Sequence, residues 1–223
     1  MENTHISSRY DEQLGRIKTG TLDMGNLVIA QLRKATDALT EFDADAVEDL
    51  IAADRMINGL HKSSYNRAER LIALRQPMAL DLRQALLPIS IAGQLERIGD
   101  HAKSTAKRAR VLAGTDLDES IIDLIQKMSV LTCTALKDVL RAYDASDIDL
   151  AAEIRARDVD IDALNKQVFA KAVEATQANA DQAETYIHLI LLARGFERVG
   201  DQAVNIARHV HQIVTGEDLK ASE

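Results

Sequence analysis

The segment LERIGDHA, residues 95–102, recurs 101 residues later as FERVGDQA, residues 196–203. Each copy lies in a longer run whose apolar residues are spaced alternately three and four apart. This spacing is typical of a helix that packs one face into a bundle. The recurrence of such a helix predicts an all-α protein with an internal duplication.

The duplication extends upstream of this segment at an offset of 104. The matched residues are Asp54, Ile57, Leu60 and Lys62 with Asp158, Ile161, Leu164 and Lys166, and Met24, Leu27 and Leu32 with Met128, Leu131 and Leu136. The change in offset indicates that the second copy is about three residues shorter between its second and third helices. We therefore predict two three-helix repeats, residues 1–114 and 115–223.

The composition supports this fold class. Of 223 residues, 46% are hydrophobic, only 3% are aromatic and two are proline, which favours helices over sheet. Breaks in the apolar pattern near residues 40–44, 74–77, 113–116, 144–147 and 176–181 predict six helices. The expected architecture is two tandem, sequence-related bundles of up-down helices, as in spectrin-like repeats.

Charge and cysteine content narrow the functional classes. A net charge of −8 argues against binding of nucleic acid, whose phosphates require a basic face. The first residues lack a signal-peptide pattern and no run of about 18 apolar residues occurs, so we expect a cytoplasmic protein. Cys133 is the single cysteine, and we interpret it as part of the core.

The repeated segment carries paired carboxylates. Glu96 and Asp100, like Glu197 and Asp201, are four residues apart and lie on the side of the helix roughly opposite its apolar face. Two like charges at this spacing repel by a few tenths of a kcal/mol. A divalent or trivalent cation would offset the repulsion, since carboxylates at this spacing can share a metal.

Further oxygen-bearing side chains accompany both pairs. Ser104 and Asn205 follow one turn later, and the preceding helices carry Asp54 with Asn58 and Asp158 with Asp162. These six residues are candidates for additional metal ligands or for groups that support the ligands. Because Ser104 stands where the second copy has Asn205, we expect unequal sites, with the better metal binder in the second half.

A simpler interpretation treats the acids as solvated surface. Against it, Gly99 and Gly200 lie within predicted helices, each at a cost of about 1 kcal/mol relative to alanine, which suggests close approach by another group. The alternative is that each glycine admits a neighbouring helix, while Arg97 and Arg198 pair with the acids.

No catalytic residues are predicted. The sequence contains no phosphate-binding GxxxxGK[ST] loop and no GxGxxG dinucleotide motif. Glu184 precedes His188 by four residues, one too many for the Glu-x-x-His pattern of di-iron bundles. Two alternatives to a metal-binding regulator stay open: a metal-dependent enzyme acting on phosphate compounds, and a metal-independent helical scaffold for basic partners.

The two Glu-Arg-x-Gly-Asp segments, with Asn205 after the second, resemble the PhoU family of bacterial phosphate-uptake regulators. The segment from Arg75 to Arg83 resembles that family's entry into its third helix, and Asp54 with Asn58 resembles its second-helix signature. The likeness covers nearly the whole chain.

The resemblance implies a homodimeric, non-enzymatic, cytoplasmic protein that restrains the phosphate-specific transporter and the phosphate-starvation response when phosphate is plentiful. It implies contact with the ATPase subunit of the transporter and a sensor histidine kinase, and only peripheral association with membrane complexes. It also implies multinuclear metal clusters held by Glu96, Asp100, Glu197 and Asp201. Oxygen ligands suit iron, manganese, magnesium, calcium or zinc, so the metal is undefined, as are the partner-contacting residues.

Overall fold

The computed structural model describes residues 2–217, with side chains from Arg9 onward. This part of the chain forms six α-helices and no strand. Their bounds are α1 Glu2–Asp37, α2 Ala44–Arg75, α3 Ala79–Leu112, α4 Glu119–Ala145, α5 Ile148–Ala178 and α6 Ala183–Thr215, with a short 3-10 helix, η1 Ala180–Gln182, before α6. The predicted all-α fold with six helices is confirmed.

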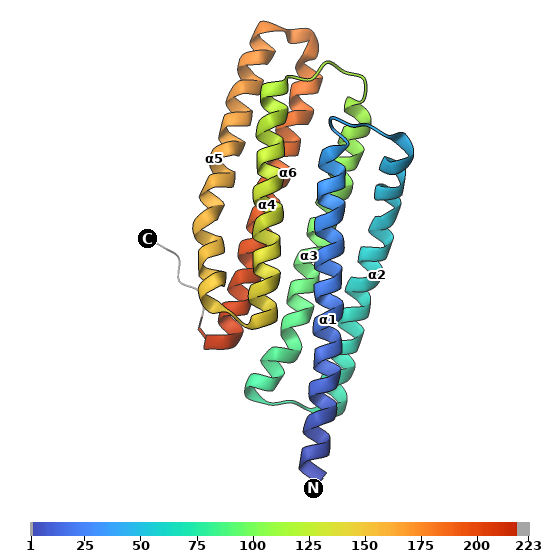
Figure 1. The fold of residues 1–223 in the computed structure, drawn as a ribbon, viewed down its shortest axis with the longest axis vertical. Helices are drawn as coiled ribbons and strands as arrows, with labels where there is room; N and C mark the ends of the chain where they lie inside the picture. The colour runs from blue at the N-terminus through green and yellow to red at the C-terminus, as the bar shows by residue number, and fades with distance from the viewer. Residues whose placement is uncertain (1, 218–223) are drawn as a thin grey trace.

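The helix ends follow from local chemistry. Asp43, Asp118 and Asp147 accept hydrogen bonds from backbone amides in the first turns of α2, α4 and α5, which satisfies donors that the helix itself leaves unpaired. Gln76 and Ser146 end α2 and α4 in the left-handed conformation. The connections are therefore short, and consecutive helices run antiparallel (Figure 1).

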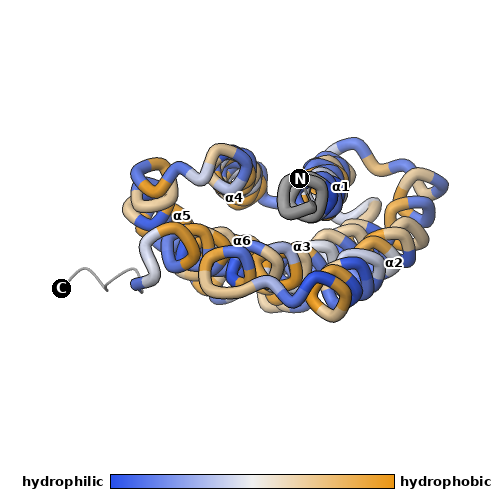
Figure 2. The backbone as a smooth tube through the Cα atoms, turned by 90° about the horizontal axis from the view of Figure 1, so that it is seen from below, coloured by the Kyte–Doolittle hydropathy of each residue, from blue (hydrophilic) through white to orange (hydrophobic). Residues whose placement is uncertain are grey.

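The helices form two layers. Seen along the helices, α5, α6, α3 and α2 make a curved row in that order, and α4 and α1 lie side by side across one face of it (Figure 2). The contacts agree with this picture, since α3 packs against α6 and α1 packs against α4. None of the described helices is both long and apolar enough to cross a bilayer.

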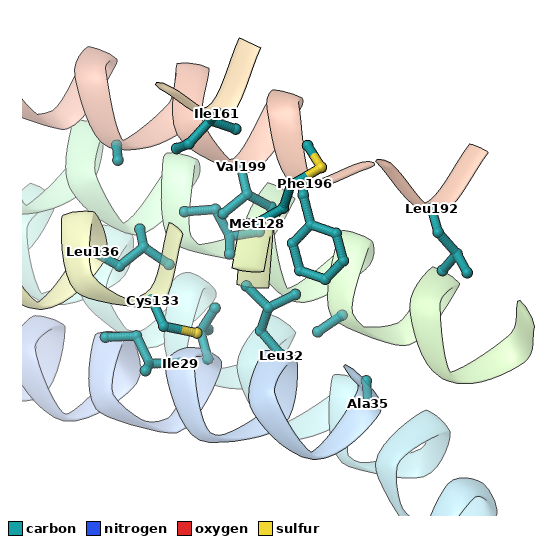
Figure 3. Packing of buried hydrophobic residues seen from close by; sticks show 14 of the residues in the cluster. Ile29, Leu32, Ala35, Met128, Cys133, Leu136, Ile161, Leu192, Phe196 and Val199 are labelled. Carbon is teal, nitrogen blue, oxygen red and sulfur yellow. The ribbon is translucent and has the colours of Figure 1, made fainter. Parts of the chain in front are cut away.

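One hydrophobic core joins the two halves. Figure 3 shows Leu32 of α1, Met128 and Cys133 of α4, and Phe196 and Val199 of α6 pointing into the same region. All five belong to one continuous cluster of buried residues that draws on every helix. Cys133 is thus a core residue, as predicted.

The halves meet with approximate two-fold symmetry. A Cβ on Gly25 of α1 would lie 2.5 Å from Leu140 Cδ1 of α4. The matching pair, Ser129 of α4 and Thr36 of α1, is joined by a hydrogen bond of 2.9 Å between the hydroxyls. Because residues 25 and 36 correspond to 129 and 140 in the repeat, the same patch of each half forms the interface.

Candidate functional site

The two mid-helix glycines admit a neighbouring helix. A Cβ on Gly99 would lie 2.8 Å from Ile57 of α2, and a Cβ on Gly200 would lie 3.1 Å from the equivalent Ile161 of α5. Helix packing therefore accounts for both glycines without a ligand. The same close approach places the acidic stretch of α2 beside α3 and that of α5 beside α6.

In the second half this approach gathers four carboxylates. Asp158 Oδ1 would lie 2.5 Å from a Cβ on Gly200. Burial, together with the neighbouring negative charges of Asp162, Asp201 and Glu197, raises the pKa of Asp158 to about 6. Burial also raises the pKa of Glu197. Residues from α5 and α6 that the sequence placed on separate helices thus form one acidic cluster, Asp158, Asp162, Glu197 and Asp201.

This acidic cluster has little compensating charge. Arg194 Nη1 lies 2.9 Å from Glu197 Oε1, and no other ion pair reaches the cluster within the described residues. Glu197 Oε2 is buried and has no hydrogen-bond partner among the residues that the structure describes. A buried acceptor left unpaired is costly, and a hard cation with oxygen ligands would satisfy it.

The first half differs at the corresponding place. Asp54 of α2 is 4% exposed and accepts hydrogen bonds from Lys103 Nζ of α3 at 2.7 Å and from Asn58 Nδ2 at 3.1 Å. The hydrogen bond to Asp54 raises the pKa of Lys103, with added attraction from Asp54 and Asp100. In the first half, the ammonium group of Lys103 therefore neutralises the charge of Asp54.

The remaining predicted residues are spread around these groups. Glu96 is half-buried and makes no ion pair with the described part of the chain, Asp162 and Asp201 are exposed, and Asn205 is half-buried on α6. Ser104 lines a hollow between α3 and α6. Neither Arg97 nor Arg198 forms the ion pair with these acids that the alternative interpretation expected. The ion pairs that do form are Lys103 with Asp54 and Arg194 with Glu197.

Lys103 is not among the site residues predicted from the sequence. The repeat alignment held a usable signal, because Lys103 corresponds to Val204 at the offset of 101. A lysine replaced by valine beside otherwise matching acids indicates that one copy carries an internal cation and the other lacks it.

Neither half has its acidic side chains arranged for metal binding within the described residues. Among residues 9–217, no group of three or more His, Cys, Asp or Glu side chains has the arrangement that could hold a metal ion. For a metal to be held in the second half, the side chains of the exposed Asp162 and Asp201 would have to turn toward Asp158 and Glu197. In the first half Lys103 would also have to leave Asp54.

Both repeats match the same known protein family. A family model described as PhoU domain matches the chain twice, over residues 21–109 and 125–210. A phosphate-specific transport system accessory protein PhoU homolog from Caulobacter vibrioides is 34% identical over 96% of this chain and 94% of its own length. The Escherichia coli accessory protein PhoU is 28% identical over 98% of this chain and 90% of its own length.

Solved structures agree with the fold. PhoU from Pseudomonas aeruginosa superposes with a TM-score of 0.89 at 27% identity, over 93% of this chain and 100% of that one. The phosphate transport system regulatory protein PhoU from Streptococcus pneumoniae gives 0.86 at 27% identity, over 95% and 100% of the two chains. The likeness therefore covers both repeats and their relative arrangement.

Proposed function

This chain belongs to the PhoU family, and from that premise we propose that it is a metal-binding, non-enzymatic regulator of phosphate uptake. It acts in the cytoplasm as an accessory protein of a phosphate-specific transport system. It restrains the transporter and the phosphate-starvation response when phosphate is plentiful, through contact with the ATPase subunit and a sensor histidine kinase.

The observation that supports the metal part is the undercompensated acidic cluster of the second half. Asp158, Asp162, Glu197 and Asp201 share one surface region with a single paired arginine. Their carboxylate oxygens are ligands for hard cations such as magnesium, manganese or iron. A bound cation would neutralise their mutual repulsion and satisfy Glu197 Oε2, so that α5 and α6 are held together more firmly.

Metal content of matched variants tests this part. We expect the double variant Glu197→Ala with Asp201→Ala to lose most of the manganese or iron that the full-length wild type retains after dialysis, measured by elemental analysis. The first-half pair Glu96→Ala with Asp100→Ala is the control and should lose less, because Lys103 already neutralises Asp54. Equal metal content in wild type and both variants would contradict metal binding by these residues.

A gene deletion tests the regulatory part. Deletion in the host should raise expression of phosphate-scavenging genes in phosphate-rich medium, and the wild-type gene should restore repression. Unchanged expression after deletion would rule out the proposed restraint. Complementation with the Glu197→Ala, Asp201→Ala gene then shows whether metal binding is needed for it.

Partner contact and self-association are tested separately. Pull-down of the transporter ATPase subunit and of the sensor kinase by the full-length protein is expected, and sedimentation should give a homodimer. Hydrolysis of phosphate esters with added manganese, magnesium or iron should stay at background. Hydrolysis above background that is lost in the Glu197→Ala, Asp201→Ala variant would instead favour a metal-dependent enzyme.

A further inference from the structure

A second polar site lies between α3 and α6, the two central helices of the row. It is a hollow of about 260 Å³ whose lining includes Asp100, His101, Ser104, Arg108, Arg194 and Arg198. The lining thus contains three positively charged arginines and one negatively charged aspartate. This positive surface occurs in a chain whose net charge is −8, so it is not a consequence of overall composition.

Within the described part of the chain, two of the three arginines have no carboxylate partner. Arg194 pairs with Glu197, but neither Arg108 nor Arg198 has a carboxylate within 4.0 Å among the described residues. Arg108 is half-buried, and its Nη1 is held 3.2 Å from Nδ1 of His188. Burial lowers the pKa of Arg108. A partly buried guanidinium without a counter-charge is unfavourable unless an anion joins it.

The internal repeat supplies a comparison for these cations. At the offset of 101, Arg108 corresponds to His209 and Arg194 corresponds to Gly93. The same helix packing is therefore achieved on the other side of the approximate two-fold axis without these two arginines. Their presence in this hollow is not a requirement of the fold.

We propose that this hollow binds a small tetrahedral oxyanion, with inorganic phosphate as its physiological form, held by Arg108 and Arg198 and bordered by Arg194. The planar guanidinium presents paired N–H donors that match the oxygens of phosphate. Ser104, which also lines the hollow, offers a hydroxyl donor. Asp100 lies at the same hollow and accepts a hydrogen bond from a protonated form such as HPO₄²⁻.

This inference goes beyond the proposed function. A regulator of phosphate uptake can receive its signal entirely from a partner, whereas an oxyanion site would let this chain respond to phosphate directly. The two arginines that hold the anion, Arg108 and Arg198, are not among the predicted metal ligands, although the lining also includes Asp100 and the Glu197 partner Arg194. Failure of this inference would leave the metal and regulatory proposals standing, and their failure would leave this one standing.

The test is calorimetric titration of inorganic phosphate into the chelator-treated full-length protein in a low-salt buffer. We expect saturable binding at one site per chain. The double variant Arg108→Gln with Arg198→Gln should weaken it by at least about tenfold. Arg97→Gln is the matched control, because Arg97 occupies the position equivalent to Arg198 but does not line the hollow, and it should bind as the wild type does.

Competition defines the ligand class. If sulfate displaces phosphate, the hollow is a general oxyanion site. If sulfate does not displace phosphate, the hollow is selective for phosphate. Both outcomes support the proposal. Binding that is absent up to roughly 10 mM phosphate, or that the double variant leaves unchanged, would overturn it. Helix content and melting temperature of each variant are measured first. If the double variant does not fold, Arg198→Gln alone, at an exposed position, carries the same test.

Discussion

At the scale of single residues, one difference between the repeats sets the charge of both candidate sites. Asp54 and Asp158 are equivalent, yet the first is paired with Lys103 while the second faces three other carboxylates. Valine at position 204 leaves no cation where the first half has lysine. We therefore expect the second repeat, which lacks the internal lysine, to be the repeat that binds an external cation.

Lys103→Met should destabilise the protein by about 1 to 3 kcal/mol, because Asp54 would be left buried with only the Asn58 hydrogen bond. Thermal unfolding measures the effect. Lys107→Met, one turn later at an exposed position of α3, is the control and should change stability little. Adding Asp54→Asn to Lys103→Met should recover part of the loss, and no recovery would mean that the lysine stabilises by packing alone.

Asp158 predicts a pH dependence of stability in metal-free protein. Its pKa is raised from 3.8 to about 6 on folding, so the folded state binds more protons than the unfolded state between these values. The free energy of unfolding should therefore fall as the pH rises from about 4 to about 6. After allowance for solvent screening of this half-exposed group, the contribution is about 1 kcal/mol.

Asp158→Asn should remove that part of the fall and make the metal-free protein more stable at pH 7. Chemical denaturation at several pH values measures both. Asp160→Asn, two residues away at an exposed position of α5, is the control. Identical pH profiles for wild type and Asp158→Asn would show that the carboxylate is not perturbed by its neighbours.

At the scale of helices, the pairs α2 with α3 and α5 with α6 are built on the same glycine contact. Gly99 meets Ile57 and Gly200 meets Ile161, and Gly200 also meets Asp158. Absence of a side chain lets the backbones approach closely. The contact explains why the glycine persists in both copies of the motif despite its cost in a helix.

Alanine substitution at these two glycines should destabilise the protein, whereas alanine at a glycine with open space around it should stabilise the protein. Gly99→Ala and Gly200→Ala should each destabilise by about 1 to 3 kcal/mol through overpacking. Gly59→Ala, within α2 with nothing within 4 Å of a new Cβ, should stabilise by about 0.5 to 1 kcal/mol. Melting temperatures give the signs. Stabilisation by Gly200→Ala would mean that the helices separate freely there.

At the scale of the whole molecule, the two repeats are joined by one core. Phe196 and Val199 of α6 share a buried cluster with Leu32 of α1 and Met128 of α4 (Figure 3). The central contacts of α3 with α6 and α1 with α4 cross the repeat boundary. The division into residues 1–114 and 115–223 stays a prediction about sequence units, and the packing leads us to expect cooperative unfolding.

Phe196→Ala should destabilise the protein by about 3 to 5 kcal/mol. It should also lower the protection of backbone amides against hydrogen exchange in both repeats. Amide hydrogen exchange measures this for α1 to α3 and α4 to α6 separately. The control is Phe169→Ala on α5, where the residue is 56% exposed, and little change is expected. Loss of protection confined to α4 to α6 would show that the repeats unfold independently.

Much of the fold could be predicted from the sequence. Apolar spacing and the five breaks near residues 40–44, 74–77, 113–116, 144–147 and 176–181 are local signals, and they predicted all six helices. The carboxylates were found because the motif is duplicated. Local sequence patterns could not predict which polar side chains meet, since Lys103 lies 49 residues from Asp54 and Arg108 lies 80 residues from His188.

The amino-acid sequence by itself determined the helices, the duplication and the family, because helical periodicity and a repeated motif are properties of neighbouring positions. Only the tertiary structure decided which charges meet. It placed Lys103 on Asp54, left Asp158 among carboxylates and gathered arginines of α3 and α6 at one hollow. Coulomb interactions depend on distance in space, and separation along the chain does not specify that distance.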